Sequence, residues 1–200
     1  MSRNPMEVHM SVSIAAAAGT SALKIAGGFY FADFVSGVFH WMEDRYGDPE
    51  WPIVGHTIRE NQQHHHTPRS FLKGNLYTRN REVWVIGIAF LGLFFALGWL
   101  NLFTASAVLF GMFANEIHAS AHRSPKENGP IVTGLQKLGL MQSHAHHAAH
   151  HRKGKDSHYC VMSNHINPVL ERVQFFQTIE RTIKAISGAV PRLDDSVNPR

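Results

Sequence analysis

Two apolar runs separated by a single residue constrain the fold of this chain most. Residues 83–100, VWVIGIAFLGLFFALGWL, and residues 102–115, LFTASAVLFGMFAN, contain no charged side chain. As a helix the first run would be about 27 Å long, which is close to the hydrocarbon thickness of a bilayer. Two such runs are difficult to bury in a soluble protein of 200 residues. The sequence therefore favours membrane-spanning helices over buried soluble ones.

A third apolar segment, residues 11–42, carries only Lys24 and Asp33 as full charges. We therefore expect an all-α integral membrane protein with about three spanning helices, over residues 12–40, 83–100 and 102–119. The few residues around 98–101 leave room only for a tight hairpin between the second and third spans. The chain length suits a single domain over residues 1–200.

Lysine and arginine are concentrated on one side of this arrangement. With three spans, residues 41–82 and residues from 120 onward fall on the same side, and both segments are rich in Lys and Arg, whereas the hairpin turn has none. That side is expected to be cytoplasmic, in a bacterial inner membrane or alternatively in the endoplasmic reticulum. A net charge of +4 suits anionic headgroups, and the dispersed basic residues argue against a nucleic-acid partner. The single cysteine, Cys160, excludes an internal disulfide and fits a reducing compartment.

Fourteen of the fifteen histidines fall in the segments expected on the cytoplasmic side or at the cytoplasmic ends of the expected spans. On a helix, residues four apart share a face, so His118 and His122 can hold one metal ion together. The stretch HHAAHH doubles this spacing, and its neighbouring residues point about 100° apart, so one helix can serve two ions. The histidines expected to converge on a metal centre are His40, His64, His65, His118, His122, His146, His147, His150 and His151.

The ligand type alone does not identify the metal, because imidazole binds iron, copper, zinc and nickel. A structural zinc site needs four ligands, usually with cysteine among them, and this chain has one cysteine. The number of histidines favours two metal ions with open positions for oxygen.

Five motifs occur together in this order: ADFVSGVFHWMEDRYGDPEWPIVG, HHHTP, FANEIHASAH, HHAAHH and NPVLER followed by PRLDD. Over about residues 30–195 the chain resembles the Kua/CarF lipid desaturase family, which includes plasmanylethanolamine desaturase and the plant chloroplast palmitate desaturase. The resemblance implies an integral membrane, non-haem di-iron oxidoreductase of lipid metabolism that uses O2. Vinyl ether formation in an alkyl ether phospholipid is the first expectation. Acyl-chain desaturation on an intact phospholipid is the alternative.

The same resemblance implies two iron ions as cofactor and assigns the nine histidines as ligands. A further histidine of the family is replaced near Lys155, so His158 is a candidate tenth ligand. His66, His144 and His165 are expected to be additional surface histidines, and His56 a loop residue. Electrons are expected from a donor such as cytochrome b5 or ferredoxin with its reductase, and the oligomeric state stays open.

Two polar residues are candidates to orient the ligands through their second ring nitrogen. Asp33 precedes His40 by seven residues on the same helical face, and Asn115 precedes His118 by three. Basic residues are candidates for contact with a lipid phosphate, although positive-inside topology alone would also explain them. These residues are Arg69, Lys73, Arg79, Arg81, Arg152, Lys153 and Lys155.

Residues 168–187 predict one amphipathic helix with an apolar stripe of Phe176, Ile179, Ile183 and Ile186. We expect it to lie along the membrane interface as part of a His-rich helical cap, with core packing as the alternative. Two other functions remain open, a lipid hydroxylase and a non-enzymatic metal-binding or metal-transport protein. The fixed spacing of the histidines argues against the latter.

Overall fold

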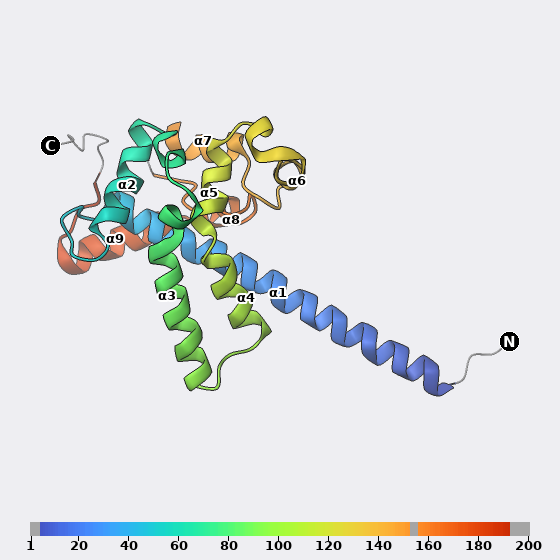
Figure 1. Ribbon diagram of the computed structural model, residues 1–200. Helices are drawn as coiled ribbons and strands as arrows, with labels where there is room; N and C mark the ends of the chain where they lie inside the picture. The colour runs from blue at the N-terminus through green and yellow to red at the C-terminus, as the bar shows by residue number, and fades with distance from the viewer. Residues whose placement is uncertain (1–4, 153–155, 193–200) are drawn as a thin grey trace.

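One long helix, α1, extends from Pro5 to Arg45 and contains the first expected span. The computed structural model describes residues 5–152 and 156–192, with the side chains of residues 13–151 and 156–192. The N-terminal half of α1 projects away from the rest of the fold, and its C-terminal part lies among the other helices (Figure 1). The stretch Ser13–Arg45 is long and apolar enough to cross a membrane.

Helices α3 (Leu76–Ala96) and α4 (Leu102–Gly111) form a hairpin that projects from the same body (Figure 1). Asn101 ends the connecting loop, and its side chain accepts hydrogen bonds from the backbone N–H groups of Phe103 and Thr104. The Thr104 hydroxyl accepts in return from the Asn101 backbone at 2.9 Å, which completes a capping box. The expected tight hairpin is therefore confirmed.

The apolar run that begins at residue 102 forms two helices instead of one. Helix α5 (Ala114–His122) follows α4 after a bend of 46°, and the pair together is long and apolar enough for a broken span or a re-entrant loop. At the bend the Phe113 N–H bonds to Phe110, three residues back, so the α-helical ladder is interrupted. Helix α3 does not qualify as a span and has three charged residues, Arg79, Arg81 and Glu82, in its first two turns. Three spans are therefore not confirmed: the described residues contain one qualifying helix, or two with the bent pair.

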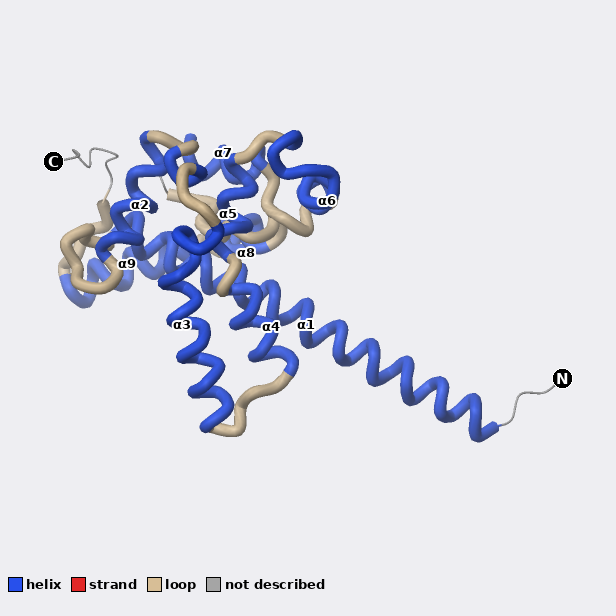
Figure 2. The backbone as a smooth tube through the Cα atoms, viewed as in Figure 1, coloured by secondary structure: helices blue, strands red, loops and turns tan. Residues whose placement is uncertain are grey.

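The remaining helices gather around the C-terminal end of α1 and make a cap at one end of the molecule (Figure 1). They are α2 (Gly55–His66), the 3₁₀ turn η1 (Ser70–Leu72), α6 (Pro125–Lys137), α7 (His144–Arg152), α8 (Ile166–Arg172) and α9 (Phe175–Ser187). No strand occurs in the part of the chain that the structure describes (Figure 2). The all-α expectation is confirmed.

The expected single helix over residues 168–187 is interrupted between α8 and α9. Gln174 adopts a left-handed conformation (φ 50°) at the break. The following helix, α9, packs its apolar stripe against Trp41 and Tyr159. The stripe residues packed there are Phe176, Ile179 and Ile183. Ile186, the last residue of the expected stripe, is 82% exposed. Core packing, the alternative reading, therefore holds for most of the stripe.

A close helix crossing brings α1 against the hairpin. A Cβ atom added at Gly28 would lie 2.7 Å from the Phe103 carbonyl oxygen and 2.8 Å from the Ala107 nitrogen. Only glycine permits this separation between α1 and α4. Because α4 continues into α5, the crossing also sets the position of the α5 histidines relative to those of α1.

Candidate metal centre

Side chains from four helices, α1, α2, α5 and α7, converge in the interior. They are His40 and Asp44 from α1, His64 and His65 from α2, His118 and His122 from α5, and His147, His150 and His151 from α7. Eight of the nine histidines expected to converge are therefore brought together. Eight of these nine side chains form two adjoining groups of four potential ligands, and His151 lies between the groups.

The first group contains His64, His118, His122 and His147, all of them buried. The Nε2 atom of His147 lies 2.9 Å from that of His118 and 2.9 Å from that of His122. The Nε2 atoms of His118 and His122 are 3.3 Å apart, as the four-residue spacing predicted. One α-helical pair and two imidazoles from other helices thus point at a common centre.

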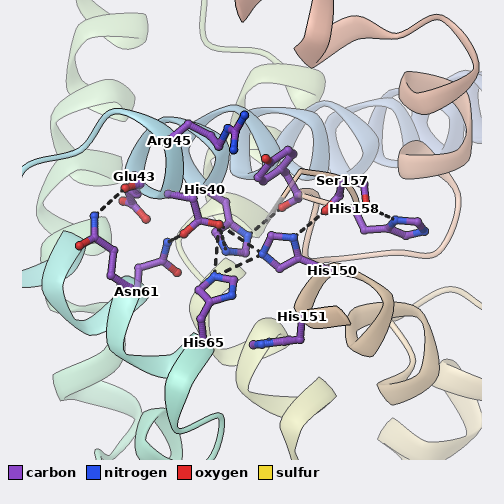
Figure 3. A network of polar contacts seen from close by, with 12 residues as sticks. His40, Glu43, Arg45, Asn61, His65, His150, His151, Ser157 and His158 are labelled. Carbon is purple, nitrogen blue, oxygen red and sulfur yellow. Dashed lines mark hydrogen bonds and ion pairs between the residues drawn. The ribbon is translucent and has the colours of Figure 1, made fainter. Parts of the chain in front are cut away.

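The second group contains His40, Asp44, His65 and His150. The Asp44 Oδ2 atom lies 3.5 Å from His40 Nε2, 3.2 Å from His65 Nε2 and 3.3 Å from His150 Nε2. Figure 3 shows the His40, His65 and His150 rings turned toward one another around this position. The second group therefore combines three imidazoles with one carboxylate.

His151 lies at the junction of the two groups. It forms a third set with His64 and His65, one residue from each main group. Its Nε2 atom is 3.0 Å from His147 Nε2, and its ring centroid is 4.7 Å from that of His65. Figure 3 shows His151 beside His65. The two groups are therefore neighbours, and His151 can serve either one.

The close nitrogen atoms fit metal coordination better than hydrogen bonding. A neutral imidazole has only one N–H, so three mutually adjacent Nε2 atoms cannot all be satisfied by one another. Ligand atoms at about 2.1 Å from one ion, in tetrahedral or octahedral geometry, lie about 3.0–3.4 Å apart. In the described part of the chain, His40 Nε2, His64 Nε2 and Asp44 Oδ2 are buried without a hydrogen-bond partner. The donor set fits two divalent metal ions.

Backbone carbonyls fix two rings of the second group. The Nδ1 atom of His40 is 3.0 Å from the Tyr159 carbonyl oxygen, and that of His150 is 2.6 Å from the Ser157 carbonyl oxygen. Donation from Nδ1 leaves Nε2 deprotonated and turned toward the centre. Both carbonyls belong to the irregular segment between α7 and α8.

Asn61 supports both groups from helix α2. Its backbone carbonyl contacts the Nδ1 atom of His64, and its side-chain amide donates to Asp44 Oδ1 at 3.0 Å. The second carboxylate oxygen of Asp44 is thereby left to face the imidazoles. Asn61 is 8% exposed, so these contacts are protected from water.

The charge state of the histidines suits a metal site. Burial, followed by the neighbouring imidazoles, holds the pKa of His64 and of His147 well below the usual value for histidine. Both rings are therefore neutral near pH 7 and have a lone pair available for a metal ion.

A cavity of about 120 Å³ lies beside the first group and is lined by Pro68, His122, His144, His147, Ala148 and His151.

His146 and His158 lie outside both groups. The His146 Nε2 atom is 3.1 Å from the Asn167 side-chain nitrogen, and its ring centroid is 4.8 Å from that of His158. His158 in turn pairs with Glu171 at 2.6 Å and points away from the centre in Figure 3. Adjacent residues on α7 point about 100° apart, so His146 faces outward when His147 faces inward. HHAAHH thus contributes three histidines to the groups and not two separate pairs.

Neither residue expected to orient a ligand contacts one directly. Asp33 accepts hydrogen bonds from the backbone N–H groups of Met162 and Ser163, at 2.8 and 3.1 Å, and not from His40. The Nδ1 atom of His40 already bonds to a backbone carbonyl. Asn115 donates to the Arg79 carbonyl oxygen at 2.7 Å and ties α5 to α3.

The candidate headgroup contacts differ in availability. Arg79 is 8% exposed and pairs with Glu116 at 2.7 Å, so its charge is already matched inside the protein. Arg69 pairs with Glu127 at 2.6 Å, but its side chain is 61% exposed. The side chain of Arg152, and all of Lys153 and Lys155, lie outside the described residues.

The histidines expected to be additional also lie outside the two groups. His144 Nδ1 is 2.8 Å from the Ala121 carbonyl oxygen, and His165 Nδ1 is 2.9 Å from the Tyr30 hydroxyl. His66 is exposed on α2. His56 is also exposed on α2, so the expectation that it lies in a loop is wrong. Sequence reasoning missed Asp44, although the spacing from His40 to Asp44 repeats the four-residue spacing of His118 and His122.

Comparison with known proteins gives relatives whose names agree with a metal-dependent reaction. A family model described as a lipid desaturase domain matches residues 29–194. The chain is 35% identical over 169 residues to fatty acid desaturase 4-like 2, chloroplastic, of Arabidopsis thaliana, covering 82% of this chain and 60% of that protein. It is 32% identical over 177 residues to plasmanylethanolamine desaturase of Myxococcus xanthus, with coverages of 84% and 62%.

A mouse protein, plasmanylethanolamine desaturase 1 of Mus musculus, is 28% identical over 195 residues, covering 86% of this chain and 68% of that protein. The chain spans about three fifths of the length of the Arabidopsis and Myxococcus relatives. No solved structure matches the chain.

Proposed function

The chain belongs to the lipid desaturase family, and from this premise we propose that it is an integral membrane, O2-dependent di-iron desaturase of a phospholipid chain. The observation that carries the proposal is the pair of adjoining four-ligand groups, built from buried imidazoles and one carboxylate. A structural zinc site would need only one such group. Two groups side by side favour a pair of redox-active ions.

Iron fits this donor set because imidazole and carboxylate are ligands that iron accepts, and no thiolate stands in either group. Two bound iron ions would supply reduction of O2 coupled to removal of two hydrogens from neighbouring carbons, and both oxygen atoms would leave as water with two electrons from a donor and two protons from solvent. The protein's part is to hold the imidazoles neutral and fixed. The carbonyls of Asn61, Ser157 and Tyr159 do this from outside the centre.

The lipid chain would approach along the apolar helices. Large apolar side chains of α1 and of the α3–α4 hairpin are exposed, including Phe31 at 49%, Val85 at 69% and Phe95 at 75%. Such surfaces are stable in a bilayer and unstable in water. We place α1 and the hairpin in the membrane as three spans, with the histidine cap and α9 at the cytoplasmic surface. A bacterial inner membrane is the favoured location, and the endoplasmic reticulum the alternative.

The proposed substrate is an alkyl ether phospholipid that is converted to a vinyl ether. The similarity to plasmanylethanolamine desaturases of Myxococcus and mouse supports it. An acyl chain of an intact phospholipid is the second candidate, which the similarity to the Arabidopsis fatty acid desaturase favours. Arg69, exposed at the edge of the cap, remains the best-placed candidate for the lipid phosphate.

A separate electron donor completes the reaction, and cytochrome b5 or a ferredoxin with its reductase has suitable chemistry. Lipid profiling of cells that express the chain tests the proposal against cells that express the His118→Ala variant. Acid-labile vinyl ethers present only with the unchanged chain support the first substrate, and a new double bond in an acyl chain supports the second. Incorporation of oxygen into the product would indicate a hydroxylase. No change in any lipid, together with no O2 consumption by the purified protein, would contradict the desaturase assignment.

A further inference from the structure

An irregular segment, residues 157–163, passes through the interior between α7 and α8 and is here called the strap. All of its residues are buried except His158, which is 14% exposed at its side chain. Buried backbone without regular structure must find partners for every N–H and C=O group. The partners found by the strap divide into two sets with different consequences.

The first set of partners consists of two imidazoles of the second metal group, those of His40 and His150. The Ser157 and Tyr159 carbonyls accept from the Nδ1 atoms of His150 and His40. Both of these histidines belong to the second metal group and neither to the first. In the first group, His64 is held instead by the Asn61 carbonyl of its own helix. The strap is therefore attached to one of the two groups only.

The second set consists of buried side chains that hold the strap in place. Gln142 donates to the Cys160 carbonyl at 2.6 Å, and Asn167 bonds to both the N–H and the C=O of Cys160, at 2.9 and 2.8 Å. At Gly37 of α1, an added Cβ atom would lie 3.0 Å from the Cys160 nitrogen, so the strap packs directly on the helix backbone. These contacts leave the strap little freedom to shift.

Asp33 is the charged member of this set and is fully buried. Its Oδ1 atom accepts from the Met162 N–H at 2.8 Å. Its Oδ2 atom accepts from the Ser163 N–H at 3.1 Å and from the Ser163 hydroxyl at 2.6 Å. Hydrogen bonds to a carboxylate are about twice as strong as neutral ones, so Asp33 is the firmest single anchor of the strap.

We infer that Asp33 is a positioning residue that controls the metal affinity of the second group selectively, acting through the strap on His40 and His150. A carboxylate on α1 fixes the strap, and two carbonyls of the strap fix two rings that otherwise rotate about χ2. Loss of such outer support costs about 10–100-fold in metal affinity. The inference rests on the proposed metal centre, but it concerns which ion is lost and not which lipid is oxidised.

Cobalt binding to the metal-free, detergent-solubilised full chain tests this. Bound Co²⁺ per chain, measured across a titration, should show two ions for the unchanged protein. In the Asp33→Asn variant one ion should bind as before and the other about 10-fold more weakly, the lower end of the cost of losing a direct partner, because Asp33 acts one contact further out. Asn115→Ala, which removes a hydrogen bond between α3 and α5 that does not touch the strap, is the matched control and should keep both ions.

Double variants identify the ion that is lost. Asp33→Asn combined with His150→Ala should bind the ion of the first group as tightly as His150→Ala alone does, because both changes act on the second group. Asp33→Asn combined with His122→Ala should weaken both ions, because the two changes act on different groups. The inference would be overturned if the Asp33→Asn variant bound both Co²⁺ ions with affinities within about twofold of the unchanged protein. It would also be overturned if both ions were weakened equally.

A milder pair of variants covers the case in which Asp33→Asn does not fold. Ser163→Ala removes one hydroxyl donor to Asp33, and Ser106→Ala removes one buried hydroxyl from the contact between α1 and α4. Ser163→Ala should weaken one ion by a few-fold and Ser106→Ala neither, and equal behaviour of the two variants would contradict the inference. Two bound Co²⁺ ions with no desaturated lipid would defeat the proposed function alone. Desaturation with unchanged metal affinity in the Asp33 and Ser163 variants would defeat this inference alone.

Discussion

The Oδ2 atom of Asp44 lies 3.2 Å from the Nε2 atom of His65, and these two side chains come from different helices. The other carboxylate oxygen of Asp44 accepts from the Asn61 amide at 3.0 Å. Asp44 is the one carboxylate of the second group, and the first group is made of imidazoles alone. The two ions would therefore differ in ligand charge, because Asp44 is the one anionic side chain in the two groups that the described residues form.

Replacing Asp44 by asparagine keeps the size of the side chain and removes its charge. We expect the ion of the second group to bind at least about 100-fold more weakly, since the loss of a ligand exceeds the loss of its outer support. Metal analysis should give about one ion per chain, and desaturation should fall to background. Asp48→Asn, which changes an exposed carboxylate in the loop that follows α1, is the control and should retain both. Two retained ions in Asp44→Asn would show that Asp44 is not a ligand.

Two neighbouring histidines of α7 should behave differently. His147→Ala removes a ligand of the first group, so activity and one metal ion should be lost while the protein remains inserted in the membrane. His146→Ala removes a ring that bonds to Asn167 outside both groups, so activity should remain within several-fold of the unchanged chain. Lipid product and metal content measured on the same preparations check this. Equal loss from both variants would contradict the separation of inward and outward histidines on α7.

The ion pair between Arg79 and Glu116 should contribute to stability. Arg79 is 8% exposed, and its replacement by alanine leaves the partly buried Glu116 paired only with Arg123 at 2.6 Å. We expect a loss of about 1–2 kcal/mol in the free energy of unfolding, less than for a fully buried pair. Thermal unfolding in detergent measures it. Arg81→Ala, on the exposed side of the same helix, should change stability by less than about 0.5 kcal/mol, and a similar loss in both variants would contradict the assignment.

Removal of metal should destabilise the fold as well as stop the reaction. An ion present at about 100 times its dissociation constant stabilises the protein that binds it by about 2.7 kcal/mol. Chelation should therefore lower the unfolding temperature, and added Fe²⁺ or Co²⁺ should restore it. The His66→Ala protein, changed outside both groups, should show the same response. An unfolding temperature that is indifferent to chelator would argue against metal ions that bridge four helices.

Much of the fold and of the site follows from spacing in the sequence. The two uncharged runs predicted a helical hairpin, because the few residues between them are too few for anything but a tight turn. The structure places that turn at residues 97–101. The four-residue spacing of His118 and His122 predicted their shared face, and the structure places their Nε2 atoms 3.3 Å apart. These features depend on one helix or one turn, so local periodicity is enough to predict them.

The remaining features depend on contacts between distant segments. The contacts of His146 with Asn167 and His158 lie outside the metal groups and involve segments that follow α7, so the repeat HHAAHH does not encode them. The true partners of Asp33 lie in the strap, far along the sequence, so helical spacing pointed instead to His40. The role of Asp44 depends on its contacts with His65 and His150 from two other helices, and the spacing of the histidines alone does not predict these contacts.

The most direct test is a structure of the metal-loaded protein with anomalous scattering measured at the iron absorption edge. Two peaks are predicted, one bounded by His64, His118, His122 and His147, and the other by His40, Asp44, His65 and His150. A single peak, or two peaks whose ligands include His146 and His158, would contradict the arrangement of paired groups from which the proposed chemistry follows.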